Sequence, residues 1–253
     1  MDRADAQAQK MKNPEEPDFF QKYNLDPQAV YTGVIFGLIT LALIFVFTRK
    51  RSRGSTLLIC GPCESGKTCL FGQLLHKKQL ETYTSAKENK GHLSVPGRAP
   101  LPVVDVPGHE RLRVKYLEEY KNQVKAIIYV VDSSTLQKQL RDTAEYLFNI
   151  ITNPIIYTKR PKIMVVCNKQ DLSLAKGQNV IQKELEKEME LLRGTHSRTL
   201  QETNDQNVER VEIGQDGEEF QFRHLPMKVE FCELSAQSSE TMDSLRKWAY
   251  GLA

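Results

Sequence analysis

The stretch of the sequence that most clearly predicts chemistry is a glycine-rich segment ending in lysine and threonine. It runs from Gly61 to Thr68, reads Gly-Pro-Cys-Glu-Ser-Gly-Lys-Thr, and matches the phosphate-loop pattern G-x-x-x-x-G-K-[ST]. Glycines let backbone N–H groups wrap around phosphates, and the N-terminus of the helix that follows adds positive potential. We therefore predict that Lys67 faces the β- and γ-phosphates of a nucleotide and that the Thr68 hydroxyl ligates Mg²⁺.

Two further motifs follow apolar stretches of the chain. Asp105 to His109 reads Asp-Val-Pro-Gly-His, and Asn168 to Asp171 reads Asn-Lys-Gln-Asp. An acid at the end of a strand beside the phosphate loop can hold Mg²⁺ through water, and Gly108 lets its N–H approach the γ-phosphate. The Asp171 carboxylate can accept both the ring N–H and the exocyclic amine of guanine, a pair of donors that adenine lacks. The sequence thus predicts a guanine nucleotide.

The elements that must position these motifs alternate between apolar runs and helical patterns, as in a βαβ series. Several runs are apolar without alternation, as expected when both faces of a parallel sheet are covered. Strands are expected at 56–60, 102–106, 126–131, 163–167 and 229–234. Helices are expected directly after the phosphate loop, at 136–151 and at 242–249. The pattern predicts an α/β fold with a doubly wound, mostly parallel sheet.

A charged insertion is expected at about 172–225. A helical pattern covers 180–192, and a polar passage rich in Gly, Thr, Asn, Gln and charged residues follows from Arg193 to Gly217. We interpret this passage as a mobile surface loop, with a partner contact as the alternative.

An uncharged stretch precedes the domain. Ala29 to Thr48 is strongly apolar over about 20 positions, enough to cross a hydrocarbon core, and it lacks the polar stripe of a buried core helix. Basic residues crowd its C-terminal side, so the positive-inside rule places the following domain in the cytosol and the N-terminus on the lumenal or outer side. The expected order is a disordered polar arm (1–28), a transmembrane helix (29–48), a basic linker (49–55) and a globular domain (56–253).

The composition indicates which partners are disfavoured and whether the cysteines are reduced. Lys and Arg number 35 against 32 Asp and Glu, and a net charge of +3 argues against direct nucleic-acid binding. The cysteines are odd in number and do not form the two C-x-x-C pairs of a typical zinc site, which favours reduced packing thiols over zinc ligands. They are Cys60, Cys63, Cys69, Cys167 and Cys232.

The ordered motifs, with Ser235-Ala236-Gln237 after the last expected strand, resemble the Ras superfamily of GTPases, nearest its Arf and Sar branch. An N-terminal span joined by a short basic linker to such a domain further resembles the β-subunit family of the signal recognition particle receptor. The stretches that carry this likeness are 105–113, 167–171 and 225–231. The resemblance covers nearly everything from Thr56 onward. It implies a P-loop GTPase fold, an endoplasmic reticulum membrane location and GTP-dependent binding to the receptor's α subunit, and it leaves contact with the ribosome or translocon open.

The resemblance also implies a site for GTP or GDP with Mg²⁺. The residues expected to bind the nucleotide are Gly61, Pro62, Cys63, Glu64, Ser65, Gly66, Lys67, Thr68, Cys69, Leu70, Thr82, Tyr83, Thr84, Ser85, Gly108, Asn168, Lys169, Asp171, Ser235 and Ala236. The residues expected at the metal are Thr68, Thr84 and Asp105. Spacing places the threonine that closes over Mg²⁺ at Thr84, with Thr82 as the alternative.

Hydrolysis is expected to be slow. His109 stands where the family places its water-orienting residue and is the candidate catalytic residue, although contact with the γ-phosphate region or a simple loop role are alternatives. Any side chain at Cys63, the third position of the phosphate loop, can crowd the γ-phosphate.

Three functions are compatible with this pattern. The main hypothesis is a GTP-gated anchoring subunit whose ordered loops form a docking face. A cycling Arf/Sar-like GTPase that regulates membrane traffic is the alternative, and a fixed anchor disfavours it. A scaffold with a degenerate pocket is disfavoured because no nucleotide motif is missing.

Overall fold

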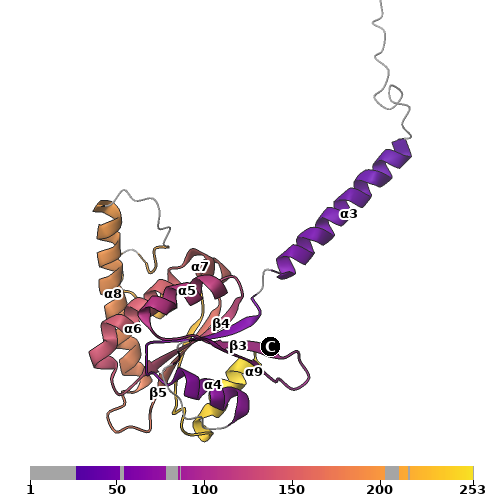
Figure 1. Cartoon of the computed structure of the whole chain (residues 1–253). Coiled ribbons are helices and arrows are strands. Elements are labelled where there is room, and N and C mark those ends of the chain that lie inside the picture. Colours follow the sequence, from indigo (N-terminus) through magenta and orange to yellow (C-terminus); the bar gives the residue numbers. More distant parts are fainter. Residues whose placement is uncertain are drawn as a thin grey trace, which may run out of the picture. The chain divides into compact units, whose positions relative to one another are not determined.

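The computed structural model describes residues 27–51, 54–77, 85, 87–202, 211–215 and 217–252. The chain divides into two units, Met1–Arg51 and Ser52–Ala253. Figure 1 labels their elements. The predicted polar arm lies outside the described residues, apart from Pro27 and Gln28.

The first unit contains one long helix, α3 (Pro27–Arg51). It includes the whole uncharged stretch and continues through residues 49–51 of the predicted linker, because Lys and Arg are good helix formers. The side chains at positions 31–42 are exposed, Phe36 by 72%. Within the part of the chain that the structure describes, no helix meets both the length and the hydropathy needed to cross a membrane. The transmembrane span at 29–48 stays a prediction.

The second unit is built on a six-stranded sheet in the order β2-β3-β1-β4-β5-β6. Only the edge strand β2 runs antiparallel to its neighbour, so the predicted mostly parallel sheet is confirmed. The strands are β1 (Thr56–Cys60), β2 (Asn89–Leu93), β3 (Leu101–Asp105), β4 (Val124–Asp132), β5 (Lys162–Asn168) and β6 (Val229–Glu233). The sequence missed β2 because this edge strand reads Asn-Lys-Gly-His-Leu and buries only its last residue.

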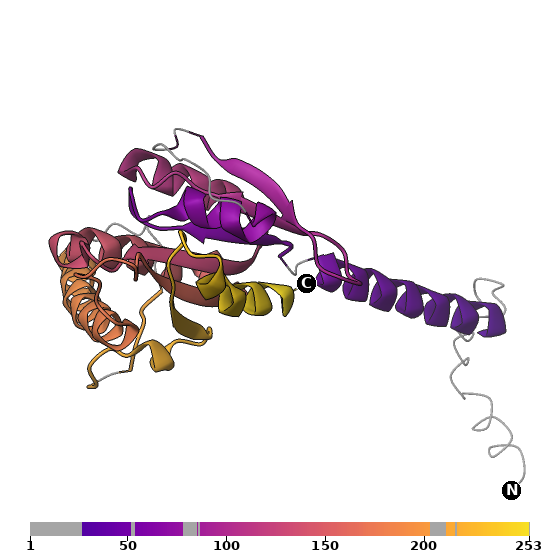
Figure 2. The same ribbon diagram turned by 90° about the horizontal axis from the view of Figure 1, so that it is seen from below.

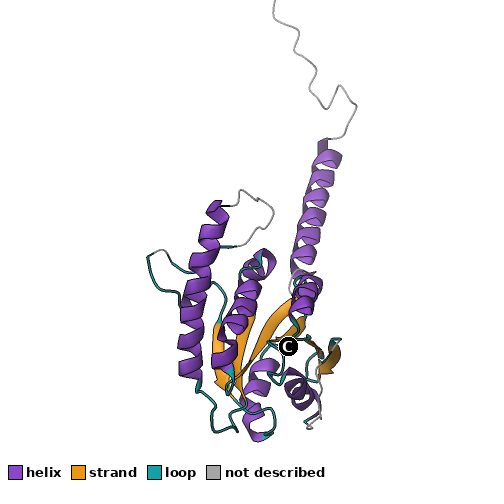
Figure 3. Ribbon diagram, turned by 60° about the vertical axis from the view of Figure 1, so that its left-hand side comes forward, coloured by secondary structure: helices purple, strands orange, loops and turns teal. Residues whose placement is uncertain are grey.

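Helices cover both faces of the sheet. Figure 1 shows α4 (Lys67–His76) and α9 (Asp243–Tyr250) on one face, and Figure 2 shows the same two helices from below. The other face carries α5 (Glu110–Tyr120), α6 (Leu136–Ile151) and α8 (Gln178–Glu202). Shorter helices complete the domain: α7 (Pro154–Lys159), η1 (Phe222–His224) and η2 (Glu240–Met242). Figure 3 shows the sheet between these helical layers.

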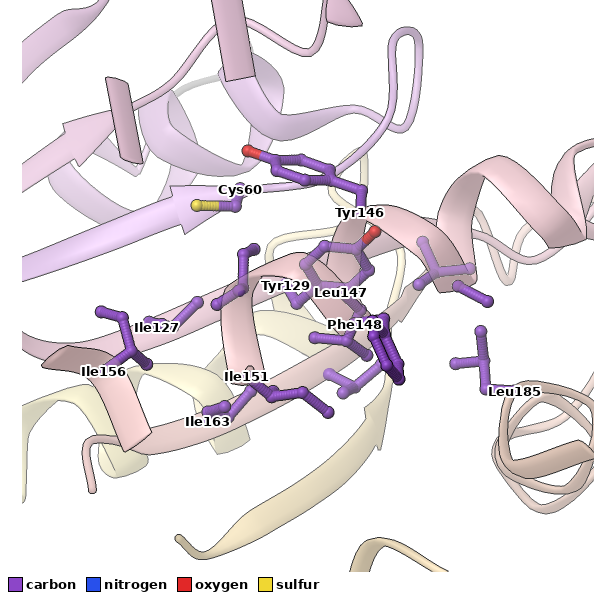
Figure 4. Close-up of a cluster of buried hydrophobic side chains, with 14 of the residues drawn as sticks. Cys60, Ile127, Tyr129, Tyr146, Leu147, Phe148, Ile151, Ile156, Ile163 and Leu185 are labelled. Atoms are coloured by element: carbon purple, nitrogen blue, oxygen red, sulfur yellow. The ribbon is translucent and has the colours of Figure 1, made fainter. Parts of the chain in front are cut away.

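The core consists of two clusters separated by the sheet, and alternate residues of β1 enter each. Leu57 and Ile59 face α4 and α9, whereas Leu58 and Cys60 face α6. Figure 4 shows part of the second cluster. The cysteines, all of which lie in the described part, are free thiols, and burial raises the pKa of Cys60 to about 12. A thiol held protonated in this way is a packing group rather than a nucleophile.

Much of the predicted insertion belongs to this core. The helix α8 continues to Glu202, ten residues beyond the predicted end, while residues 203–210 lie outside the described part. One of its faces is fully buried on α6 through side chains four residues apart: Ile181, Leu185 and Met189. Phe220 and Phe222, beyond the polar passage, are also buried, and their N–H groups donate to Glu190 and Glu186 of α8. The passage predicted as a surface loop, Arg193 to Gly217, is instead helical through Glu202, and Ile213 within it is buried. Its mobility stays a prediction.

Candidate nucleotide-binding site

The predicted motifs meet at one edge of the sheet because each follows the carboxyl end of a parallel strand. The phosphate loop follows β1, Asp105 ends β3, Asn168 ends β5 and Ser235 follows β6. In open α/β sheets this edge is where ligands bind. Hydrogen bonds between the motifs join distant parts of the chain there: Thr68 to Asp105 over 2.7 Å, and Asn168 to the Ser65 carbonyl over 2.8 Å.

Two glycines are required by the shape of the phosphate loop. Gly61 has φ +147° and Gly66 has φ +90°, in the left-handed region that side chains disfavour. A Cβ on Gly61 would lie 2.2 Å from the Val130 carbonyl oxygen, and one on Gly66 would lie 2.3 Å from Asn168 Nδ2. The loop is thus pressed against β4 and the guanine motif, with its backbone free to turn around a phosphate.

Lys67 is buried at the first turn of α4. Its Nζ donates to the Pro62 carbonyl over 2.6 Å, and the Ser65 hydroxyl donates to the same oxygen over 3.0 Å. Burial lowers the pKa of Lys67, while the nearby Asp105 carboxylate acts in the opposite direction. A desolvated ammonium held over a glycine-rich loop is suited to an anion of high charge density.

The residues at the predicted metal position form a polar cluster. Thr68 Oγ1 and Asn89 Nδ2 donate to the same Asp105 oxygen, Oδ2, over 2.7 and 2.9 Å, and Ser85 Oγ lies 3.1 Å from Thr68 Oγ1. The second oxygen, Asp105 Oδ1, is buried and has no hydrogen-bond partner in the described part. Burial raises the pKa of Asp105, and the hydrogen bonds from Asn89 and Thr68 oppose this.

This cluster fits Mg²⁺ held in part by a bound nucleotide. In the described residues, no group of three or more His, Cys, Asp or Glu side chains could hold a metal ion unaided. Mg²⁺ commonly takes one or two protein oxygens and completes its shell with waters and phosphates. The Thr68 hydroxyl and the unpartnered Asp105 oxygen supply that small protein share.

The guanine motif is organised by side-chain hydrogen bonds. Asn168 is buried, and its Oδ1 accepts from the Ala236 N–H over 2.9 Å. Lys169 Nζ donates to Asp132 at the end of β4 over 2.7 Å. Asp171 is exposed, and its Oδ1 accepts from the Ser235 hydroxyl over 2.6 Å. The carboxylate is therefore oriented by a neighbouring loop and accessible to an incoming base.

Gly108 packs directly on the phosphate loop. A Cβ there would lie 2.6 Å from the backbone nitrogen of Cys63 and 2.7 Å from Lys67 Nζ. The adjacent His109 is exposed and caps α5, its Nδ1 accepting from the Arg111 N–H over 3.3 Å. The catalytic role of His109 stays a prediction.

The remaining predicted residues divide into three groups. Cys69 Sγ contacts the Ala236 carbonyl oxygen over 3.4 Å, and Leu70 is a core residue of α4. Glu64 has φ +61° at the bend of the phosphate loop. Thr82, Tyr83 and Thr84 lie outside the described residues, so the choice between the two threonines stays open.

Sequence reasoning missed several residues that hold the site together: Asn89, Arg113, Asp132 and Asp142. A partial signal existed for Asp132, which ends an apolar strand in the same way as Asp105. Asn89 gave none, because it reaches Asp105 only through the pairing of β2 with β3, which sets these two residues opposite each other.

Comparisons with known proteins agree on one family. A family model described as the signal recognition particle receptor beta subunit matches residues 52–229. The signal recognition particle receptor subunit beta of Rattus norvegicus is 35% identical over 239 residues, covering 90% of this chain and 88% of the rat protein. The Homo sapiens protein of that name is 35% identical over 233 residues, covering 89% of this chain and 86% of its own. A solved structure of the mammalian SRP receptor is 35% identical with a TM-score of 0.67, and covers 78% of this chain and 100% of that one.

Proposed function

Because the chain belongs to the β-subunit family of the signal recognition particle receptor, we propose that it is that receptor's membrane-anchored, GTP-binding subunit. It holds the α subunit, as a heterodimer, at the endoplasmic reticulum membrane for co-translational protein targeting. GTP controls this docking: the α subunit binds when GTP is present and is released from the GDP form.

The observation that carries the proposal is that Asp105, the last residue of β3, and Gly108, shortly after it, both contact the phosphate loop. Thr68 donates to Asp105, and Gly108 lies against the loop backbone and the Lys67 ammonium. A Mg²⁺ ligand and a group able to detect the γ-phosphate are thus side by side. A third phosphate would add a contact to the Gly108 N–H, and Gly108 leads into α5, so a bound γ-phosphate can stabilise one conformation of the surface around α5.

Each part of the site has a distinct task in nucleotide binding. Lys67 would neutralise phosphate charge, and Thr68 and Asp105 would hold Mg²⁺, which would supply further positive charge to the phosphates. Asp171 accepts the two guanine donors, and the Ser235 hydroxyl keeps its carboxylate in place. The Ala236 N–H donates to Asn168 Oδ1, and the loop that contains Ala236 is the proposed neighbour of the guanine carbonyl.

Hydrolysis is a slow, secondary activity in this proposal. The Cys63 side chain crowds the γ-phosphate, and His109, whose Nδ1 caps α5, is the candidate water-orienting residue. Binding, rather than turnover, then carries the function.

The helix α3 is the proposed membrane anchor. It has no charged residue from Ala29 to Thr48, and its described side chains at 31–42 are exposed apolar or small groups for the most part. The arginines and lysine at 49–51 and 53 keep the nucleotide-binding domain in the cytosol, with the N-terminus in the lumen. Such a fixed anchor, with the family membership, favours this function over that of a cycling Arf/Sar-like GTPase.

The test is nucleotide specificity in the full chain purified in detergent. We expect bound guanine nucleotide, no measurable affinity for ATP, and a loss of about 100-fold or more in GDP and GTP affinity for Asp171→Ala. Two charge-assisted hydrogen bonds, each contributing about 1.5 to 3 kcal/mol, are removed by this change. Glu119→Ala, at an exposed position of α5, is the matched control. Equal affinity for ATP and GTP, or guanine binding that survives Asp171→Ala, would overturn the proposal.

A further inference from the structure

Arg113 connects the segment at Gly108 to α6. It is not among the residues that the sequence predicted to bind nucleotide or metal. The residue lies on α5, and only 8% of it is exposed. Its Nε donates to the Gly108 carbonyl over 2.7 Å. Its two terminal nitrogens donate to both oxygens of Asp142 on α6, over 2.5 and 2.8 Å. One guanidinium therefore spans three elements, using the planar fork that lysine lacks.

The loop end of this connection is tied to the first turn of α5. The N–H groups of Leu112 and Arg113 both donate to the His109 carbonyl, and the His109 imidazole caps the helix. Arg113 then reaches back to the Gly108 carbonyl. Gly108, His109 and α5 are thus held as one piece, so any shift of Gly108 must move the helix or break the Arg113 contact.

The other end is fixed to α6. Asp142 lies on α6, and the Arg113 guanidinium carbon is 4.6 Å from the centre of the Tyr146 ring on the same helix. Tyr146 packs edge-on against Tyr129 of β4 with ring centres 5.7 Å apart, and the Tyr129 hydroxyl donates to the Thr143 carbonyl over 2.6 Å. Figure 4 shows both tyrosines in the cluster next to Cys60. These contacts leave α6 little freedom relative to the sheet.

We propose that the Arg113–Asp142 ion pair positions Gly108 for the γ-phosphate and so determines how strongly the protein prefers GTP over GDP. The pair holds the Gly108 peptide against the phosphate loop, where its N–H meets a third phosphate without first being ordered. GDP has no γ-phosphate and makes no use of this contact. Arg113 and Asp142 are accordingly positioning residues rather than catalytic ones. The inference rests on the proposed function, because it assumes that both nucleotides occupy this site.

The experiment compares the affinities of the full chain for GDP and for a non-hydrolysable GTP analogue. Asp142→Asn keeps the size of the side chain but removes its charge, and we expect about a tenfold loss of GTP-analogue affinity with GDP affinity within about twofold of wild type. Arg113→Lys, which retains the charge without the fork, should shift the ratio in the same direction. Asp142→Glu should restore part of the preference. Glu145→Gln, which removes an exposed carboxylate from the same helix, should leave both affinities unchanged.

The ratio of the two affinities is the decisive quantity because a purely structural role would not alter it. Equal weakening of both nucleotides, or an unchanged ratio in Asp142→Asn and Arg113→Lys, would overturn the positioning role. Thermal unfolding of each variant identifies any general loss of stability. Wild-type protein that binds neither nucleotide would instead overturn the proposed function, and the two failures are therefore distinguishable.

Discussion

At Gly108 the phosphate loop leaves no space for a side chain. A Cβ would lie 2.6 Å from the Cys63 nitrogen and 2.7 Å from the Pro62 carbonyl carbon, both of them backbone atoms that cannot swing away. We expect Gly108→Ala to push the segment around residue 108 away from the phosphate loop. GTP-analogue affinity should fall about tenfold or more, since overpacking costs about 1 to 3 kcal/mol. GDP affinity should be retained.

Equilibrium titration with the two nucleotides measures this effect. The control is Gly194→Ala in α8, where an added Cβ meets nothing within 4 Å. Unchanged GTP-analogue affinity in Gly108→Ala would show that Gly108 does not need its place against the phosphate loop.

Asp132 gives the guanine motif a pH-dependent contribution to stability. Burial acts to raise the pKa of Asp132, but hydrogen bonds from Lys169 and Ser134 outweigh it and hold the pKa below its ordinary value of 3.8. A carboxyl whose pKa is lower in the folded than in the unfolded protein stabilises the fold at pH values above its unfolded-state pKa. This stabilisation is lost as the pH falls through its folded-state pKa. Asp132→Asn should therefore lower the free energy of unfolding by about 1 to 3 kcal/mol at neutral pH.

Denaturant unfolding of wild type and Asp132→Asn from pH 7 down to below 3.8 measures this contribution. The difference between the two proteins should shrink at the acid end. A difference that stays constant across the range would contradict an ionised Asp132 paired with Lys169.

At the residue scale, the sequence predicted the groups whose contacts are set locally. The phosphate loop and the Asn-Lys-Gln-Asp motif are contiguous in the chain, and their positions at strand ends follow from the apolar runs before them. Asn89 and Asp142 are different, because their partners Asp105 and Arg113 lie far along the chain. Such contacts depend on strand register and helix packing, which single-sequence patterns do not specify.

Among the elements, strands buried on both faces were the easiest to predict, whereas weakly apolar ones were missed. The edge strand β2 and the short helix α7 lack a long apolar period, and α5 reads Glu-Arg-Leu-Arg-Val-Lys-Tyr-Leu-Glu-Glu-Tyr, with few core positions. The length of α8 was underestimated because its last turns are polar. Periodicity reports burial, so an element with little buried surface gives little signal.

The helix α3 carries its own prediction, which concerns membrane insertion. Leu38 and Leu41 are exposed positions near the middle of the uncharged stretch. Replacing both with arginine should prevent stable integration, because each charge near the centre of a span costs about 2.5 to 3.5 kcal/mol on the insertion scale. The measurement is alkaline extraction of microsomes after translation of the full chain.

Wild-type protein should stay with the microsomal pellet, and the double variant should appear in the supernatant. Leu191→Arg, at a position of α8 that is 65% exposed, controls for a general effect of added charge. A double variant that resists extraction as well as wild type would rule out α3 as the spanning segment.

At the scale of the whole molecule, the chain combines a helical unit and an α/β unit. The family and the mostly parallel α/β fold were predictable because four motifs occur in the order and spacing of one superfamily. The proposed docking face is not predictable in this way, since a surface that binds a partner needs no periodic pattern. The proposed control of docking starts at Gly108, which leads into α5 and is tied to α6 through Arg113 and Asp142.

The most direct test of this account is capture of the receptor α subunit's N-terminal fragment by the full chain in lipid nanodiscs. One sample is loaded with a non-hydrolysable GTP analogue and the other with GDP, each verified by the nucleotide released on denaturation. We expect capture in the GTP-analogue form and loss of capture in the GDP form. Equal capture in the two forms would contradict the proposed control of docking by GTP.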